Sequence, residues 1–125
     1  MSKILNRTKG AFGEDLAVRF LCTKGFRVLE RNWTCRWGEL DAVCTYNSIL
    51  VFVEVKYKSS DRYGSAFEAL DYKKKKHLLK TIRYYLLRKS HLTALWRLDA
   101  VCLTGGAAGG IDIKHYENIE LPYRS

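Results

Sequence analysis

The sequence lacks the signatures of several common protein classes. Its four cysteines show no CxxC spacing and its three histidines are scattered, so no zinc site can be read from it. It has no P-loop, nucleophile elbow or internal repeat, and its glycine-rich segment 105–110 precedes a predicted strand rather than a phosphate-binding helix. No apolar run is suited to a signal peptide or long enough to cross a bilayer. We therefore expect a cytoplasmic protein with no membrane contact.

Acidic residues are also scarce relative to basic ones. The 125 residues include 22 Lys and Arg but 13 Asp and Glu, which gives a formal net charge of +9 at pH 7. Segment 61–90 alone holds nine basic and three acidic residues. Such a segment suits a polyanionic partner, although a helix face that only keeps the protein soluble would have the same charge. The length fits a single domain, residues 1–125, with its own hydrophobic core.

A β-hairpin is the most informative element of the sequence. Segments 38–46 and 49–57 both read as strands, and Asn47-Ser48 between them is typical of a two-residue turn. A turn of that length pairs Tyr46 with Ile49 and thereby fixes every other pair. This register is favoured because a shift by one residue would mix polar and apolar side chains on both faces.

In this register four charged residues share one face of the hairpin. Asp41 is expected opposite Glu54, and Glu39 opposite Lys56. The floor below them would consist of Val43 and Phe52. The other face would be wholly apolar, with Leu40 opposite Val55, Ala42 opposite Val53, and Cys44 opposite Val51.

Two carboxylates and a lysine on one face are the minimal set for metal-dependent cleavage of a phosphodiester bond. Asp41 and Glu54 would hold a cation, which polarises the phosphoryl group and lowers the pKa of a bound water. Lys56 would neutralise charge on the phosphate or orient the attacking water. The alternative is an ordinary cross-strand ion pair on a solvated face. Against it, directly opposed like charges are destabilising unless a metal ion or Lys56 supplies positive charge between them.

A predicted helix over residues 10–24, ended by Gly25, has a further acid on its inward side. Glu14 lies three residues before Ala17 and seven before Leu21, both on the core-facing stripe. A carboxylate on the buried edge of a helix needs a partner, because an unpaired buried charge is costly. Glu14 is therefore a candidate third metal ligand. A capping or salt-bridging role in the first helical turn is the alternative.

The basic residues of segment 66–89 fall on a second predicted helix, whose longer part starts near Tyr72. Four of them recur at steps of three and four residues on one face, whereas Lys74 lies four residues before Leu78 and should lean toward the sheet. We expect this helix to bind nucleic acid. The candidate contacts are Lys73, Lys74, Lys76, Lys80 and Arg83.

Three more strands are predicted, at Phe26–Trp33, Trp96–Thr104 and Ile111–Tyr116. Trp33 and Trp37 flank the expected site and could stack on exposed bases. Aromatic residues near strand ends more often pack in the core or at the edge of a sheet, so both interpretations stay open.

Taken in order, these segments resemble the YraN-type family of small bacterial proteins, within the restriction-endonuclease-like superfamily. The matching pieces are Gly13-Glu14, Gly25-Phe26, Asn32-Trp33, Gly38-Glu39-Leu40-Asp41, Val51-Phe52-Val53-Glu54-Val55-Lys56, Tyr63-Gly64, Lys74 and Arg97-Leu98-Asp99. Thr34 and Lys58 stand where arginine is common in that family, and Leu40 replaces isoleucine. These departures leave the acidic residues intact.

The resemblance implies an α/β fold of the restriction-endonuclease-like class, with a mixed central β-sheet flanked by α-helices. By analogy with the Holliday-junction resolvases of that superfamily, it implies that Glu14, Asp41 and Glu54 are metal ligands. Lys56 would be the catalytic lysine, and the cofactor would be Mg²⁺ or Mn²⁺. Glu39 would at most orient Lys56. A shared fold does not by itself fix an activity.

We therefore expect a metal-dependent endonuclease that hydrolyses phosphodiester bonds in DNA, with branched or damaged structures as candidate substrates. Two alternatives stay open. One is a non-catalytic nucleic-acid-binding module of the same fold, and the other is an interaction protein that docks on an acidic partner through its basic helix. The oligomeric state is also open, and a homodimer is one candidate.

Overall fold

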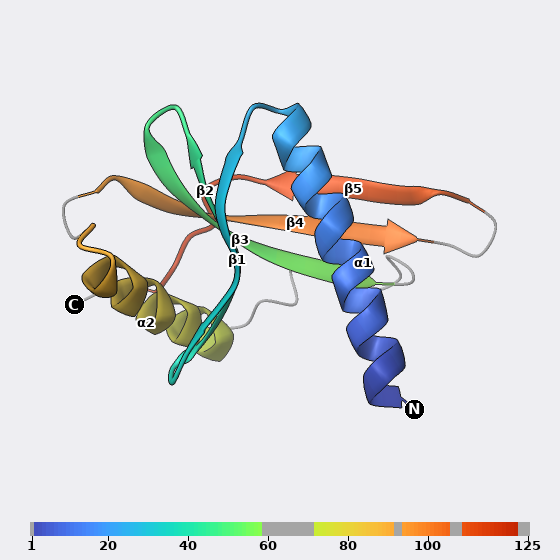
Figure 1. The fold of residues 1–125 in the computed structure, drawn as a ribbon, viewed down its shortest axis with the longest axis horizontal. Helices are drawn as coiled ribbons and strands as arrows, with labels where there is room; N and C mark the ends of the chain where they lie inside the picture. Colours follow the sequence, from blue (N-terminus) through green and yellow to red (C-terminus); the bar gives the residue numbers. More distant parts are fainter. Residues whose placement is uncertain (1, 59–71, 92–93, 106–108, 123–125) are drawn as a thin grey trace.

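The computed structural model describes residues 2–58, 72–91, 94–105 and 109–122, with residues 2–11 and 58 described by their backbone alone. Its elements in chain order are α1 (Ser2–Thr23), β1 (Arg27–Cys35), β2 (Gly38–Tyr46), β3 (Ile49–Lys58), α2 (Tyr72–Arg88), β4 (Trp96–Gly105) and β5 (Ile111–Tyr116). One five-stranded sheet has the order β1-β2-β3-β4-β5, and its neighbours are antiparallel except for the parallel pair β3 and β4. The α/β class with a mixed sheet and flanking helices is therefore confirmed (Figure 1).

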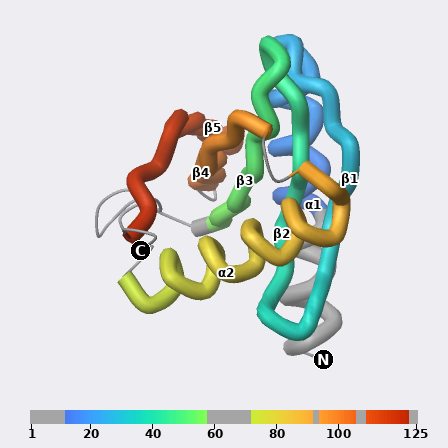
Figure 2. The backbone as a smooth tube through the Cα atoms, turned by 90° about the vertical axis from the view of Figure 1, so that its left-hand side faces the viewer, coloured from blue at the N-terminus to red at the C-terminus, as the bar shows by residue number. Residues whose placement is uncertain are grey.

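The two helices pack on opposite faces of the sheet. The core on the α1 side consists of Ala17, Leu21, Phe26, Ala42, Cys44, Val51, Val53, Val101 and Leu103. The core on the α2 side consists of Leu40, Val43, Leu50, Phe52, Leu78, Ile82, Tyr85, Leu86, Leu98, Ala100 and Ile119. Because β3 and β4 contribute alternate residues to both cores, they are buried on both faces, as central strands between helical layers should be. Figure 2 shows α2 crossing one end of the sheet, with the turn between β1 and β2 extending past it.

The end of α1 is set by Gly25. The N–H of Phe26 donates to the carbonyl of Leu21 (3.0 Å) and the N–H of Gly25 to that of Cys22 (3.1 Å), while Gly25 has φ +96°. This is the Schellman ending, which needs a left-handed residue and favours glycine. The start differs from the prediction, since α1 begins at Ser2 rather than at residue 10. Glycine is disfavoured inside helices, so Gly10 concealed the earlier turns.

The other element predictions agree closely with the structure. The second helix begins at Tyr72, as its longer part was expected to, while residues 66–71 lie outside the described part of the chain. The strands predicted at the end of the chain appear as β4 and β5. In the described residues, no helix is long and apolar enough to cross a membrane.

The hairpin register is confirmed near its turn. Tyr46 pairs with Ile49, and the ladder continues to the pair of Ala42 and Val53. The turn residues Asn47 and Ser48 have φ of 50° and 67°. Two successive positive φ values are typical of the tight turns that match the twist of paired strands.

Beyond Ala42 and Val53 the sheet divides, and here the prediction was partly wrong. β2 continues along β1, where Leu40 pairs with Trp33, whereas β3 continues along β4 as far as Lys58. Glu39 pairs with Thr34 of β1 and not with Lys56, and Leu40 is not paired with Val55. Strongly twisted strands separate where each follows a different neighbour, so Asp41 and Glu54 lie at the branch point of a fork.

At one level of the sheet, the side chains of both β1 and β2 stop alternating between the two faces. A left-handed residue of β1 lies at this level. Asn32 has φ 53°. Before it, Arg31 forms an ion pair with an acid of α1; after it, Trp33 packs on two tyrosine rings of α2. β2 changes in parallel, because Ala42 belongs to the α1 side of the core and Leu40 to the α2 side. The expected wholly apolar face is therefore wrong at Leu40, since a left-handed residue interrupts the alternation of a pleated strand.

Candidate functional site

Asp41 is anchored where the ladder between β2 and β3 ends. Its Oδ2 accepts a hydrogen bond of 2.7 Å from the backbone N–H of Val55. That amide has lost its partner strand, so the carboxylate satisfies a donor that the fork leaves without one. Burial, the largest cause, and the negative charge of Glu54 together raise the pKa of Asp41 to about 7, against the opposing effect of the Val55 N–H. Asp41 therefore binds positive charge or a proton more readily than an ordinary aspartate does.

Glu54 lies on β3, with only 7% of its surface exposed. Its Oε1 is 3.4 Å from the Nζ of Lys74 and 3.7 Å from the Nζ of Lys56. A buried carboxylate is stable only with such partners. The structure thus brings a residue of α2 to the two charged residues of β3, and it confirms that Lys74 leans toward the sheet.

The two lysines differ in their affinity for a proton. Burial lowers the pKa of Lys56, and a hydrogen bond with Lys74 lowers it further against the attraction of Glu54. For Lys74, burial also acts to lower the pKa, but the hydrogen bond with Lys56 and the attraction of Glu54 outweigh it, so the pKa is raised. Two ammonium groups side by side repel each other, and this repulsion also acts to lower the pKa of Lys56.

Glu14 approaches the fork from α1. Burial raises the pKa of its carboxyl, as does the charge of Glu39, while a hydrogen bond from Asn32 acts in the opposite direction. Glu14 also contributes to the raised pKa of Asp41. The helix therefore brings a third acid near the fork, as the sequence predicted. Sequence reasoning did not identify Asn32, whose tolerance of the left-handed region is the one available signal.

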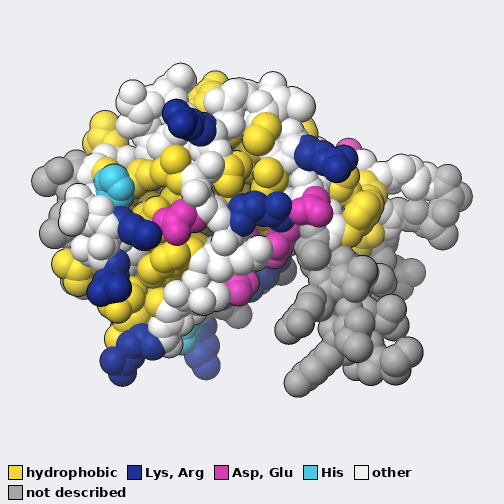
Figure 3. Space-filling view, in the orientation of Figure 1, with side chains coloured by type: hydrophobic (Ala, Val, Ile, Leu, Met, Phe, Trp, Pro, Cys, Tyr) yellow, Lys and Arg dark blue, Asp and Glu magenta, His cyan; other side chains and the backbone are white. Residues whose placement is uncertain are grey.

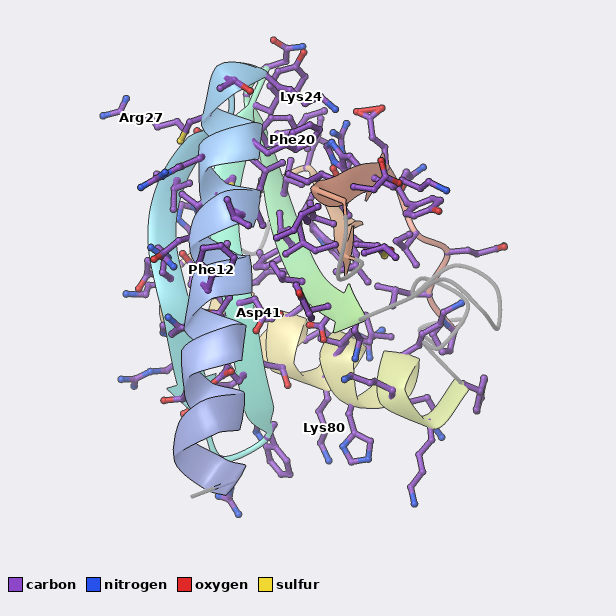
Figure 4. All side chains as sticks on the ribbon, turned by 90° about the vertical axis from the view of Figure 1, so that its right-hand side faces the viewer. Phe12, Phe20, Lys24, Arg27, Asp41 and Lys80 are labelled. Carbon is purple, nitrogen blue, oxygen red and sulfur yellow. The ribbon has the colours of Figure 1, made fainter. Side chains whose placement is uncertain are left out.

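A cavity of about 250 Å³ opens beside these residues, between β2, β3 and α2. Its lining residues are Trp37, Gly38, Glu39, Asp41, Glu54, Lys74, His77, Leu78 and Thr81. We refer to this cavity as the acidic pocket. Figure 4 shows Asp41 between the two helices, and Figure 3 shows acidic side chains grouped beside basic ones in this region. Neither Lys56 nor Glu14 lines the cavity, so the predicted residues meet at the fork without all facing one space.

Carboxylate oxygens of this kind suit a hard cation such as Mg²⁺. The raised pKa of Asp41, caused partly by Glu54, indicates an excess of negative charge that a cation would relieve. The three acids are nevertheless more widely spaced than a closed metal site. Within the described part of the chain, three ligand atoms within 4.8 Å of one another occur only at Asp99, His115 and Glu117.

The second cluster is a closed network on the α1 side of the sheet. Asp99 is fully buried and accepts hydrogen bonds from Arg97 (2.9 and 3.1 Å) and from the N–H of Asn118 (2.9 Å). The Nε2 of His115 lies 2.8 Å from Asp99 Oδ2, and the Nδ1 of His115 lies 2.7 Å from Lys24 Nζ. Burial acts to raise the pKa of Asp99, but these hydrogen bonds outweigh it and lower the pKa. Both oxygens of Asp99 are thus engaged in joining β4, β5 and the chain after β5.

Four basic residues of α2 lie on an exposed face of the helix, as expected. The side chains of Lys73, Lys76, Lys80 and Arg83 are exposed. The Nζ of Lys80 lies 3.8 Å from the ring centroid of Trp37, and Figure 4 shows Lys80 on the outer side of α2. The exposed basic face therefore continues onto the turn between β1 and β2.

The chain belongs to the uncharacterised protein family UPF0102, whose model matches residues 13–103. A UPF0102 protein of Frankia casuarinae is 40% identical over 106 residues, covering 85% of this chain and 90% of that protein. Another, of Methylococcus capsulatus, is 41% identical over 100 residues, 80% of each chain. A third, of Persephonella marina, is 40% identical over 116 residues, covering 92% and 96%. The resemblance to the YraN-type family is thereby confirmed, and the matched segment includes the whole fork.

Proposed function

We propose that this protein is a metal-dependent endonuclease that hydrolyses phosphodiester bonds in DNA. The observation that supports this best is the pair of acids at the fork, Asp41 and Glu54. Both are withdrawn from solvent, they repel each other, and they line the same cavity. Proteins seldom maintain such a pair without a charge to place between them.

Asp41 and Glu54 would hold Mg²⁺ or Mn²⁺, with Glu14 contributing from α1. The bound ion would polarise the phosphoryl group and lower the pKa of a water. Anchoring by the Val55 N–H fixes the position of one Asp41 oxygen, so a ligand of this site is held in place by the backbone. Glu54 is fixed in turn by its strand, which is buried on both faces.

The two lysines have different roles in this proposal. Lys56, whose pKa is lowered, is the group better suited to accept a proton from, or to orient, the attacking water. Lys74, whose pKa is raised, remains charged and is placed to neutralise a phosphate oxygen in the cavity. Sequence reasoning assigned both possible roles to Lys56 alone.

The outward basic face of α2 would position the DNA backbone. Lys73, Lys76 and Lys80 lie on the helix that also supplies Lys74 to the acidic pocket. Phosphate contacts by lysine and arginine set orientation and most of the affinity without reading sequence. A strand held on this face would lie along the helix that borders the acidic pocket.

One observation favours a second candidate, a non-catalytic nucleic-acid-binding module. Glu54 already has two lysine partners, so the site is partly neutralised without a metal ion. In that case the ion pairs would stabilise the fork and the basic face alone would bind DNA.

The deciding experiment is a cleavage screen over single-stranded, duplex, flapped and four-way DNA with Mg²⁺ or Mn²⁺. Glu54→Gln removes one ligand charge and keeps the side-chain size, so it should abolish cleavage while DNA binding persists. Glu120→Gln, at an exposed position outside the acidic pocket, is the matched control and should cleave like the parent. Equal cleavage by Glu54→Gln would refute the site. Metal binding and DNA binding without cleavage of any substrate would favour the non-catalytic module.

A further inference from the structure

A second cavity lies on the other side of the turn between β1 and β2. Its volume is about 330 Å³, which is within the range of ligand-binding pockets. Its walls include two aromatic residues, Trp33 and Tyr84, and three cations, Arg36, Arg88 and Lys89. None of the described residues that line it is acidic. We refer to it as the basic aromatic pocket.

The two cavities are adjacent along both elements that form them. Trp37 lines the acidic pocket and Arg36, the preceding residue, lines the basic aromatic pocket. On α2, Thr81 lines the first and Arg88 the second. Seven helical residues span about 10 Å. At about 3.4 Å per phosphate, that is the length of roughly three nucleotides of a DNA strand.

The wall between the cavities is formed by Trp37 and the two cations that contact its ring. The ring of Trp37 has the Nζ of Lys80 at 3.8 Å and the guanidinium of Arg36 at 4.8 Å from its centroid. Cations so close to the ring favour this orientation through cation–π attraction. The turn therefore separates the two cavities, and a strand that runs from one to the other must pass it.

The wall of the basic aromatic pocket that lies between β1 and the end of α2 is held by side-chain contacts without a ligand. Glu30 of β1 accepts a hydrogen bond of 2.7 Å from the hydroxyl of Tyr85, and its carboxylate lies 3.5 Å from the Nζ of Lys89. These contacts hold the end of α2 against β1. Trp33 packs edge-on against Tyr85, with centroids 5.1 Å apart. A preformed cavity avoids the entropy cost of ordering its walls on binding.

We propose that the basic aromatic pocket binds an unpaired nucleotide of the strand that runs through the acidic pocket. Trp33 and Tyr84 are tilted by 43° with centroids 6.2 Å apart, so they do not stack on each other and offer surface to a base. Stacking on aromatic side chains is how proteins hold unpaired bases without reading their sequence. A base within a duplex has both faces covered by its neighbours, so only an unpaired one fits this role.

The charges of the pocket agree with this occupant. The C-terminal end of α2 has the negative pole of the helix dipole, which disfavours an anion there. Arg88 and Lys89 stand at that end, and Arg36 faces them from the turn, so side-chain cations would hold the phosphate. This inference rests on the proposed function and narrows its substrate to DNA with a single-stranded segment beside the scissile bond.

The test uses a duplex with a short single-stranded tail that contains 2-aminopurine, compared with a blunt duplex, in EDTA. The parent should bind the tailed duplex more tightly and change the 2-aminopurine fluorescence. The double variant Arg88→Gln/Lys89→Gln should lose that preference. Its log–log salt slope for the tailed duplex should fall by roughly 1.4, at about 0.7 for each single-strand phosphate contact. Arg19→Gln/Arg27→Gln removes the same charge at exposed positions elsewhere and should keep the preference.

A second variant avoids the ion pair between Lys89 and Glu30, whose loss could weaken the fold. Tyr84→Leu keeps an apolar residue on α2 and should lower the affinity for the tailed duplex by about five- to a hundred-fold, with little effect on the blunt one. Equal affinity of the parent for tailed and blunt DNA would overturn the proposal, as would tight binding of free dAMP in place of a strand. Because these measurements need no metal and no turnover, they stay decisive even if the protein cleaves nothing.

Discussion

The carboxylate of Asp41 accepts the backbone N–H of Val55 at 2.7 Å, at the level where β2 and β3 cease to pair. The side chain of Asp41 thus accepts the hydrogen bond that a neighbouring strand would otherwise accept. The same side chain is a candidate metal ligand. Its position is therefore coupled to the shape of the sheet. Changes at Asp41 should alter stability as well as activity, and the two effects can be separated by pH and by metal.

The first prediction concerns the pH dependence of stability without metal. The pKa of Asp41 is about 7 in the folded protein, compared with the ordinary value of 3.8 expected in the unfolded chain. Below pH 4 the carboxyl is protonated in both states, and between pH 4 and 7 only the folded state keeps the proton. The free energy of unfolding should therefore fall as pH rises through this window, by up to about 4 kcal/mol. Urea unfolding in EDTA measures it.

Asp41→Asn should remove most of this pH dependence and stabilise the protein at pH 8, because the amide oxygen can still accept the Val55 N–H without a charge. Asp112→Asn, at an exposed position on β5, should leave the profile unchanged. If Asp41→Asn keeps the slope of the parent, the raised pKa belongs to another group and the excess of negative charge at the fork is disproved.

The second prediction concerns metal binding. Mg²⁺ that binds the folded state should stabilise it by about 2.7 kcal/mol at a hundred times its dissociation constant. Asp41→Asn and Glu54→Gln should each reduce that gain strongly. Calorimetry with Mg²⁺, and with Ca²⁺ as a second hard cation, measures it.

The control for this experiment is the cluster of Asp99, His115 and Glu117, whose ligand atoms lie close together. Glu117→Gln should leave the metal effect intact, because the oxygens of Asp99 are already engaged by hydrogen bonds. Loss of metal binding in Glu117→Gln but not in Glu54→Gln would transfer the metal site to that cluster.

The sequence predicted the part of the hairpin next to its turn, because two local signals agree there. The turn Asn47-Ser48 fixes the register, and alternation assigns each side chain to a face. The ladder observed from Tyr46 to Ala42 is the one these rules require. The same signals predicted that Asp41 and Glu54 are close; they line the same cavity, although the ladder ends one pair earlier and they are not themselves paired.

The part of the hairpin beyond Ala42 and Val53 could not be predicted from the sequence, because its geometry depends on how distant strands pair. Whether β2 follows β1 or β3 below Ala42 depends on the twist of the whole sheet, so the predicted pair of Glu39 and Lys56 failed. At the level of the left-handed Asn32, β2 also changes faces, so Leu40 lies on the α2 side of the core. For Lys74 the sequence predicted only that the side chain leans toward the sheet. Its contact with Glu54 was not predicted, because no sequence pattern states how closely a helix packs on a strand.

The third prediction tests the outward face of α2. Replacing Lys73, Lys76, Lys80 and Arg83 with Gln should weaken duplex DNA binding almost equally for all sequences. The log–log salt slope should become shallower by roughly 0.9 for each lost phosphate contact. Filter binding across a salt series measures it. An unchanged slope in the quadruple variant would mean that this face only keeps the protein soluble.

The fourth prediction concerns Asn32. With φ 53°, an alanine there would be strained and would also lose the hydrogen bond to Glu14. Asn32→Ala should lower the free energy of unfolding by about 1–3 kcal/mol, whereas Asn32→Gly should cost less because glycine accepts this backbone conformation. Equal losses in the two variants would show that the left-handed backbone is not what constrains this position.

The last prediction separates the two lysines by their effect on the pH dependence of cleavage. If neutral Lys56 assists the attacking water, the rate should rise with pH through the lowered pKa of Lys56. Lys74→Ala removes the neighbouring charge and hydrogen bond that lower this pKa, so the rise should move to higher pH. Lys56→Ala should abolish the rise and most of the rate while leaving the heat of Mg²⁺ binding nearly unchanged. Lys80→Ala, on the outer face of the same helix, should weaken DNA binding but leave the profile where it is. A profile that stays in place in Lys74→Ala would show that Lys56 does not act as the proton acceptor, and Lys74 would then remain only as a contact to the phosphate.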